Sequence, residues 1–291
     1  AAAMACDLTR VGNITLGMGF ILTPDERDTL VRKNPRNAER IFPYLGGEEI
    51  NTNPDQGFNR YAINFGRMEL SEAEAWPDLV KILRETVKPE RASNKRATYR
   101  DYWWLFAEYR AGLAAGLASL KRCIVTAQTA KHLCFSFQPT DRVFTTKVVV
   151  FLLSRNSALA VMQSRVMQPW VLLHSSTMRQ DLSFTSNSFE TFPFPQPDPR
   201  TEIPVLEALG ERLYTARAAY MTATQQGLTK TYNALKDPAC DDPAIVELRA
   251  LHLDLDRAVL AAYGWSDLAP LVPPYTTPHT PADRRAVETF E

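Results

Sequence analysis

The chain has 291 residues, of which 45% are hydrophobic, 10% aromatic and 23% charged. This length and composition are typical of a globular protein with one large domain or two ordinary ones, and they exclude wholesale disorder and collagen-like or low-complexity chains. The 33 Lys and Arg residues balance 33 Asp and Glu residues, so the net charge by itself indicates no class of partner.

Short elements are predicted near the start of the chain. The apolar run Asn13–Thr23, with its two glycines, indicates a strand that contains a tight bend. Thr23 followed by Glu26 is a capping box, which predicts a short helix from Pro24 to about Asn34. Apolar and polar residues alternate over Arg60–Phe65, which predicts a second strand.

The middle of the chain mixes the two kinds of element. Apolar residues recur at helical spacing over Thr98–Leu120, which predicts one long helix. Cys123–Phe137 has two β-like halves around a polar stretch, and Thr145–Leu153 is apolar and β-branched, so strands are expected in both. Ser157–Leu172 is expected to be a helix broken at Pro169.

Five prolines between Pro193 and Pro204 indicate a domain boundary. The sequence therefore predicts two domains, residues 1–195 and residues 196–291. The second has helical periodicity over Ile203–Gln225 and Pro243–Tyr263, followed by a proline-rich tail. The expected fold class is α+β, with a mixed α/β domain that contains a small antiparallel sheet, followed by a helical module.

Charge is distributed unevenly along the chain. Between Arg84 and Arg179 there are 15 Lys and Arg residues and 5 Asp and Glu residues, a net charge of +10, and the remainder carries −10. A basic middle between acidic flanks favours a local anionic partner.

The four cysteines are widely spaced, so we expect reduced thiols in a cytoplasmic protein. His132 and Cys134 have no second pair of ligands nearby, and a metal site is therefore not expected. The longest aliphatic run, Val148–Leu153, is far shorter than the roughly 20 residues that a membrane span requires. No apolar segment of the secretory type follows the N-terminus, so no signal peptide is expected.

Motifs for self-contained catalysis are not found. The sequence has no phosphate-binding loop and no nucleophile elbow. Gly17-Met18-Gly19 lacks the third glycine of a dinucleotide fingerprint, and a sharp backbone bend is the simpler interpretation. The pairs Asn34-Pro35 and Asn53-Pro54 are not followed by the proline and aromatic residue with which amino-methyltransferases hold a flipped adenine. We therefore expect no catalytic residue in this chain.

A series of short blocks points to a family. They are Gly19–Thr23 (GFILT), Asn34–Pro35, Ile41–Glu49 (IFPYLGGEE), Val87–Arg91 (VKPER), Trp103–Trp104, Ser183–Thr185 (SFT), Phe189–Pro195 (FETFPFP), Gly227–Asn233 (GLTKTYN), Leu251–Asp256 (LHLDLD) and Tyr263–Trp265 (YGW). In this order they resemble the C-terminal part of single-chain type II restriction–modification enzymes, the type IIG/IIL or MmeI-like group, and related adenine methyltransferases of phage-defence systems. The resemblance covers nearly the whole chain, and FPFP and LTKxYN are its most specific blocks.

The resemblance implies a DNA target-recognition domain followed by a helical segment. In that family this part follows a methyltransferase domain, whose catalytic Asn-Pro-Pro-aromatic block and cofactor-binding glycines are not in this chain. It therefore implies no cofactor here, and S-adenosylmethionine, with Mg²⁺ for any fused nuclease, for the full-length parent. The chain departs from the family at its start, where the polar insert between Leu8-Thr9 and Gly19–Thr23 is short.

The stretch from Thr126 to His132 is the first candidate for reading bases. It lies between two β-like halves, where a loop can enter the major groove, and the family resemblance points to the same loop. Gln128 can pair bidentately with adenine, and Lys131 can donate to guanine. The candidate base-reading residues are therefore Thr126, Gln128, Lys131 and His132, and the alternative is an ordinary polar hairpin.

The polar stretch from Ser175 to Asp181 is the second candidate. Arg179 offers a donor for guanine or phosphate, and Gln180 offers a bidentate contact to adenine. An ordinary polar turn is the alternative interpretation of this stretch.

Phosphate binding requires cations on one face. The dense basic residues that precede the predicted long helix are candidates for a phosphate clamp, with a solvated loop as the alternative. They are Lys88, Arg91, Lys95, Arg96 and Arg100.

Two functional hypotheses follow from these observations. The first is recognition of duplex DNA by one positively charged surface that displays the recognition loop. It would serve a SAM-dependent adenine-N6 DNA methyltransferase of restriction–modification or phage defence, with or without a fused nuclease, and the methyltransferase domain of the parent would be a second partner. The alternative is a protein-interaction module that docks a methyltransferase or a defence-complex subunit. A membrane partner is not expected.

Overall fold

The computed structural model of the protein describes residues 8–174, 176–178, 181–184 and 186–275. The strands are β1 (Thr9–Val11), β2 (Ile21–Leu22), β3 (Ile41–Leu45), β4 (Arg60–Ile63), β5 (Arg122–Ala127), β6 (Thr129–Ala130), β7 (Ser136–Pro139), β8 (Val143–Phe144), β9 (Val148–Phe151), β10 (Ser176–Met178) and β11 (Asp181–Ser183). The α-helices are α1 (Pro24–Lys33), α2 (Gly47–Thr52), α3 (Leu70–Ala73), α4 (Pro77–Ala92), α5 (Ala97–Asp101), α6 (Ala111–Ala118), α7 (Asn156–Gln163), α8 (Met167–His174), α9 (Ser186–Glu190), α10 (Pro204–Thr224), α11 (Leu228–Lys236) and α12 (Pro243–Ala262). The 3₁₀ helices are η2 (Met18–Phe20), η3 (Pro35–Arg40) and η4 (Ser266–Leu271).

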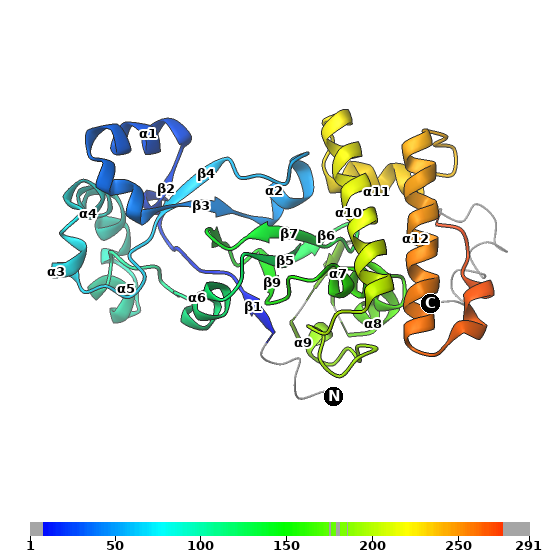
Figure 1. Cartoon of the computed structure of the whole chain (residues 1–291). Helices are drawn as coiled ribbons and strands as arrows, with labels where there is room; N and C mark the ends of the chain where they lie inside the picture. Colours follow the sequence, from blue (N-terminus) through cyan, green and yellow to red (C-terminus); the bar gives the residue numbers. More distant parts are fainter. Residues whose placement is uncertain (1–7, 175, 179–180, 185, 276–291) are drawn as a thin grey trace.

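The first lobe is built on a four-stranded sheet in the order β2-β4-β3-β8, and lies at the left of Figure 1. Its strands pair antiparallel except β3 and β8, which are parallel. Helix α4 buries Leu79, Leu83 and Val87, which recur every four residues and so share one face. These side chains join a hydrophobic cluster that includes Phe20, and this cluster is the core of the first lobe.

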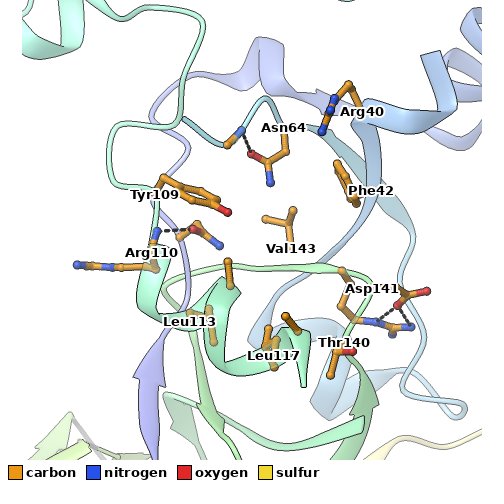
Figure 2. A pocket seen from close by; sticks show the side chains of 15 residues that line it. Arg40, Phe42, Asn64, Tyr109, Arg110, Leu113, Leu117, Thr140, Asp141 and Val143 are labelled. Atoms are coloured by element: carbon orange, nitrogen blue, oxygen red, sulfur yellow. Dashed lines mark hydrogen bonds and ion pairs between the residues drawn. The ribbon is translucent and has the colours of Figure 1, made fainter. Parts of the chain in front are cut away.

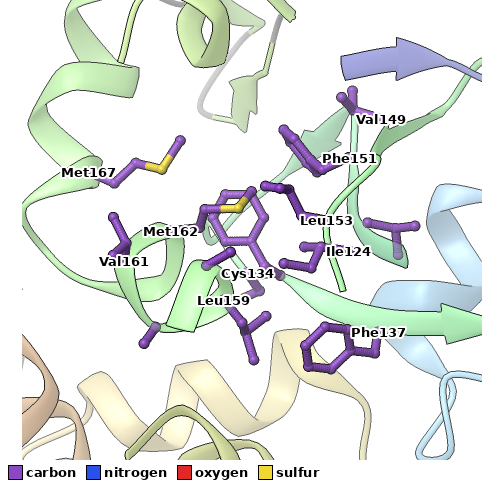
Figure 3. Close-up of a cluster of buried hydrophobic side chains, with 14 of the residues drawn as sticks. Ile124, Cys134, Phe137, Val149, Phe151, Leu153, Leu159, Val161, Met162 and Met167 are labelled. Atoms are coloured by element: carbon purple, nitrogen blue, oxygen red, sulfur yellow. The ribbon is translucent and has the colours of Figure 1, made fainter. Parts of the chain in front are cut away.

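The central lobe has an antiparallel sheet in the order β1-β9-β5-β7. All four residues of β9 are buried, as expected for a strand that is covered on both faces. Figure 3 shows Ile124 and Phe151 of this sheet facing Leu159 and Met162 of α7. The second hydrophobic cluster of the protein is centred here.

The C-terminal helices continue this second cluster. Helix α10 crosses α7 closely at Gly210, where a Cβ atom would lie only 2.4 Å from the carbonyl oxygen of Asn156, so glycine is required there. Helix α12 packs on α10 and buries Leu248, Leu255 and Val259 in one apolar stripe, which confirms the helical periodicity predicted over Pro243–Tyr263. One continuous core therefore joins the central sheet to the C-terminal helices.

A buried polar network also fastens these helices to the central lobe. The carboxylate of Asp256 on α12 accepts hydrogen bonds from the backbone N–H of Arg165 (2.8 Å) and from its Nε (2.7 Å). On the same helix, burial and the charges of Arg217 and Arg165 hold the pKa of His252 well below its usual value. His252 is therefore neutral, and it stacks on Tyr275 at 4.4 Å between ring centroids.

The predicted long helix over Thr98–Leu120 is wrong. Helix α5 ends at Asp101 and α6 begins only at Ala111. Between them Trp103, Trp104 and Phe106 are all buried, and adjacent residues of one helix could not all point into the same core. Tertiary packing has overridden the local helical pattern here.

The predicted break at Pro169 is also misplaced. Helix α7 ends at Gln163, Ser164 is extended, and α8 begins at Met167, so Pro169 lies in the first turn of α8. Proline is tolerated there because the N–H groups of the first turn have no helical partner. The capping box of Thr23 and Glu26 at the start of α1, in contrast, is confirmed.

The α+β fold class is confirmed, since these sheets are followed by helices.

Cys123 and Cys134 are buried free thiols, and burial raises the pKa of each to about 12. In the described part of the chain, no helix combines the length and the apolar character needed to cross a bilayer.

Candidate nucleic-acid interface

A small three-stranded sheet brings the two candidate base-reading segments together. Strand β11 pairs with β10 on one side and with β6 on the other. The register places Leu182 opposite Ala130 and Ser183 opposite Thr129. Segments separated by about fifty residues in the sequence therefore form one surface, which we call the β6–β11 sheet.

Thr126 is not available to a ligand, which corrects the prediction that it reads bases. It lies in β5, its side chain is buried, and its hydroxyl donates a hydrogen bond to the carbonyl oxygen of Cys134 at 2.8 Å. Gln128 is half-buried between β5 and β6. Its backbone N–H donates to Lys147 and its carbonyl accepts from Phe184, both at 2.8 Å, so its position is fixed from two sides.

Lys131 is exposed directly after β6 and is hydrogen-bonded to the C-terminal helix α11. Its Nζ donates to Oδ1 of Asn233 on α11 at 2.8 Å. An ammonium group has three N–H donors, and within the described part of the chain the other two remain available to a ligand. Of the predicted base-reading residues that the structure describes, Lys131 is the one with an exposed side chain.

His132 has a structural role, which corrects its prediction as a base reader. The residue is buried, and its Nε2 lies 2.9 Å from the same Oδ1 of Asn233. Burial, together with the charges of Lys236 and Lys131, lowers the pKa of His132, so the ring is neutral and Nε2 carries the proton toward the oxygen. The side-chain oxygen of Asn233 on α11 therefore binds two consecutive residues, Lys131 and His132.

Arg179 and Gln180, the other two predicted base readers, lie outside the described residues. The residues on either side of them are described, and Met178 is the register partner of Asp181.

Four predicted phosphate contacts lie on the surface of the first lobe. Lys88, Lys95, Arg96 and Arg100 are exposed, and we call them the basic cluster. Nη1 of Arg96 donates to the hydroxyl of Tyr99 at 2.6 Å, and Nη1 of Arg100 donates to the carbonyl of Asn94 at 2.5 Å. Among the described residues, no carboxylate forms an ion pair with these four cations.

Arg91 is a structural residue, which corrects its prediction as a phosphate contact. Its guanidinium group is buried and donates to the backbone carbonyls of Leu16 (2.8 Å), Leu105 (2.9 Å), Tyr102 (3.4 Å) and Thr15. Burial lowers the pKa of Arg91 below its usual value. The side chain organises the irregular segment between α5 and α6 and cannot reach a phosphate.

The basic cluster and the β6–β11 sheet do not form one patch. The cluster lies at the end of α4 and around α5, at the far left of Figure 1, whereas β6 lies beside α10 and α11. The expectation of one positively charged surface that displays the recognition loop is therefore wrong. A duplex that contacts both groups must lie across both lobes.

The two glycines near the N-terminus have structural roles. A Cβ atom at Gly19 would lie 1.9 Å from the side-chain oxygen of Thr86, so this glycine is needed for packing against α4. Gly17 has φ 144°, which L side chains rarely adopt. Packing and backbone conformation therefore explain why glycine stands at these two positions. In the described residues, no group of three His, Cys, Asp or Glu side chains is placed to hold a metal ion.

Sequence reasoning did not assign Asn233 to the interface. Its residue type is uninformative, and it lies more than 100 residues from Lys131. The only available signal was its place in the block GLTKTYN, in which Leu228, Thr231 and Tyr232 are buried and Lys230 is exposed like Asn233. Burial therefore explains only part of the block, and the exposed Asn233 has its role in the contacts to Lys131 and His132.

The comparisons with known proteins agree with this geometry. A search of curated proteins found no match. Among solved structures, the chain is similar to one described as the Type IIL restriction-modification enzyme MmeI in complex with DNA, with 17% identity and a TM-score of 0.62. That match covers 97% of this chain and 35% of the enzyme chain, so this chain spans about a third of its length.

The family described as "MmeI, target recognition domain" matches residues 7–196, about two thirds of the chain. This range contains the first lobe, the central sheet and the β6–β11 sheet. The chain therefore belongs to the family of MmeI target recognition domains.

Proposed function

We propose that the chain reads the sequence of duplex DNA for a SAM-dependent adenine-N6 methyltransferase of an MmeI-like restriction–modification or phage-defence enzyme. Residues 1–195 would form the recognition domain, and residues 196–291 a helical module that positions it. Catalysis would belong to a methyltransferase domain elsewhere in the parent protein. One observation carries the proposal: β6, β10 and β11 form one sheet in a chain of the MmeI target-recognition family.

The shape of this sheet suits DNA. The major groove admits a two-stranded β-ribbon, and its base edges present a unique pattern of donors and acceptors. Lys131, with its unused N–H groups, is the described donor best placed to reach guanine. The basic cluster would bind the backbone and contribute affinity that does not depend on sequence.

A pair of variants separates these two roles. Lys131→Ala should leave nonspecific binding nearly unchanged but relax discrimination at one base pair by about 1–3 kcal/mol, because one base contact is lost. Arg96→Ala should weaken all duplexes alike and reduce the slope of log K against log salt by about one. Fluorescence anisotropy with a target duplex and its single-base variants, at several salt concentrations, measures both effects.

Two outcomes would contradict this assignment. If Lys131→Ala weakened every duplex equally, the side chain would be a phosphate contact. If Arg96→Ala left affinity and salt dependence unchanged, the basic cluster would have no role in binding DNA. Lys81→Ala, on the exposed face of α4 with an ion-pair partner in Glu85, is the matched control.

A protein-interaction module is the second candidate. It is favoured by exposed apolar side chains at and just before η4, where Trp265 is 44% and Leu271 66% exposed. Such side chains are typical of a docking surface when they lie close together. A stoichiometric complex with a methyltransferase subunit, combined with no affinity for duplex DNA, would support this candidate against the first.

A further inference from the structure

A cavity of about 310 Å³ lies between α6 and the sheet of the first lobe (Figure 2). None of the residues predicted to contact DNA lines it. Its size is at the lower end of the range of about 300–1,000 Å³ that is typical of small-ligand sites. Residues of both lobes contribute to its walls, which suits a ligand site.

The polar side of the cavity presents donors. Oδ1 of Asn64 accepts from the backbone N–H of Gly66, and Oδ1 of Asn13 accepts from that of Arg110, both at 2.9 Å. These contacts orient the two amides, and each NH₂ group still has a hydrogen to donate to a ligand. In Figure 2 the amide nitrogen of Asn64 and the hydroxyl of Tyr109 point toward the same space. Nδ2 of Asn13 also makes a long contact of 3.5 Å to the carbonyl of Phe144.

The charge of the cavity is positive. Arg110 is paired with Glu108 at 2.8 Å, and Arg142 is paired with Asp141 at 3.3 Å. Arg40 lies at the upper edge of the cavity near Asn64 (Figure 2). In the described residues it has no carboxylate partner, its Nε has no hydrogen bond, and its guanidinium stacks on Trp76 at 4.6 Å. One cation is therefore left uncompensated beside a set of donors.

The remaining lining of the cavity is apolar. Val143 of β8 and Phe42 of β3 face Leu113 and Leu117 of α6 across the cavity in Figure 2. These side chains offer contact area and no hydrogen-bonding groups. A ligand that fits both the polar and the apolar lining therefore has an anionic, acceptor-rich end and a body with apolar faces.

We propose that this cavity binds one phosphate-bearing nucleotide. Arg40, Asn64, Asn13 and Tyr109 would hold the phosphate, and the sugar and base would lie on the apolar wall. Charge-assisted hydrogen bonds from several donors are the usual way in which proteins hold phosphate. The nucleotide has two possible sources, a free mononucleotide and one unit of a bound DNA strand, and in the second case the inference rests on the proposed function.

The test uses the full chain and the side-chain amide resonances of Asn64 and Asn13. Thymidine monophosphate should shift both resonances, and thymidine, which lacks the phosphate, should shift neither at the same concentration. Asn64→Asp should weaken binding of the monophosphate at least tenfold, because it replaces two donors by a negative charge. The new carboxylate can still accept from Gly66, so the local backbone is expected to remain in place.

Arg257→Gln is the matched control, since it also changes the charge by −1 and lies on the exposed surface of α12. It should bind the monophosphate as the wild type does. If thymidine shifted the resonances as strongly as its monophosphate, or if Asn64→Asp bound the monophosphate normally, the proposal would be wrong.

A duplex arm identifies the source of the nucleotide. If duplex DNA shifts the same two resonances, the cavity takes a nucleotide of the bound strand. If duplex binds without shifting them while the monophosphate does, the cavity is a site for free nucleotide. Binding of duplex with no response of either resonance to any ligand would overturn the inference and leave the proposed function standing. If the monophosphate shifted the resonances and the chain did not bind duplex, the inference would stand and the proposed function would be wrong.

Discussion

Replacing Arg91 by methionine is expected to lower the free energy of unfolding by about 3–5 kcal/mol. Its guanidinium donates to backbone carbonyls of two segments, at Thr15–Leu16 and at Tyr102–Leu105. Methionine fills similar space but has no donor, so buried carbonyl oxygens would lose their partners, at about 1–3 kcal/mol each with incomplete additivity. Urea unfolding followed by circular dichroism measures the change.

Lys95→Ala is the control for Arg91. Lys95 is exposed three residues beyond the end of α4, and its loss should change stability by less than about 0.5 kcal/mol while weakening nonspecific DNA binding. If Arg91→Met instead retained full stability and lost DNA affinity, Arg91 would be a phosphate contact after all.

The second large effect is expected at Asp256. Asp256→Ala should destabilise the protein by about 3–5 kcal/mol, because the buried guanidinium of Arg165 loses its counter-charge. Arg165 also donates to the carbonyl of Pro273 at 2.7 Å, so the segment after η4 should loosen as well. Thermal and urea unfolding measure the first effect, and proteolysis near the C-terminus measures the second.

An exposed ion pair provides the comparison for Asp256. Glu202, paired with Arg155 at the surface, should contribute only about 0–1 kcal/mol when replaced by alanine. If Glu202→Ala and Asp256→Ala lowered the free energy of unfolding equally, the buried pair would not be what stabilises the packing of α12 on the central lobe.

The elements that could be predicted are those whose signals are local. The capping box of Thr23 and Glu26 and the apolar stripe of α12 are set by residues within a few positions of each other. The segment around Trp103 and Trp104 was predicted incorrectly because its conformation depends on distant partners. Nε1 of Trp104 donates to the carbonyl of Met68 at 2.9 Å, 36 residues away, and no sequence window contains both.

The candidate site could also be predicted only as far as local residue types allow. Residue type identified Lys131 and Arg96 as plausible DNA contacts, and both are exposed. Residue type equally favoured Arg91 and His132, which the fold buries, because charge alone does not reveal which cations are used to satisfy backbone carbonyls or a neighbouring amide. Only the pairing of β11 with β6 shows that the two polar segments share one surface.

Selection of bound duplexes from a randomised DNA library tests the central claim most directly. The full chain should retain duplexes that share a short motif, and the library selected by Lys131→Ala should lose the preference at one position of that motif. Retention of duplexes without any common motif, or no retention at all, would contradict the conclusion that the β6–β11 sheet reads DNA sequence.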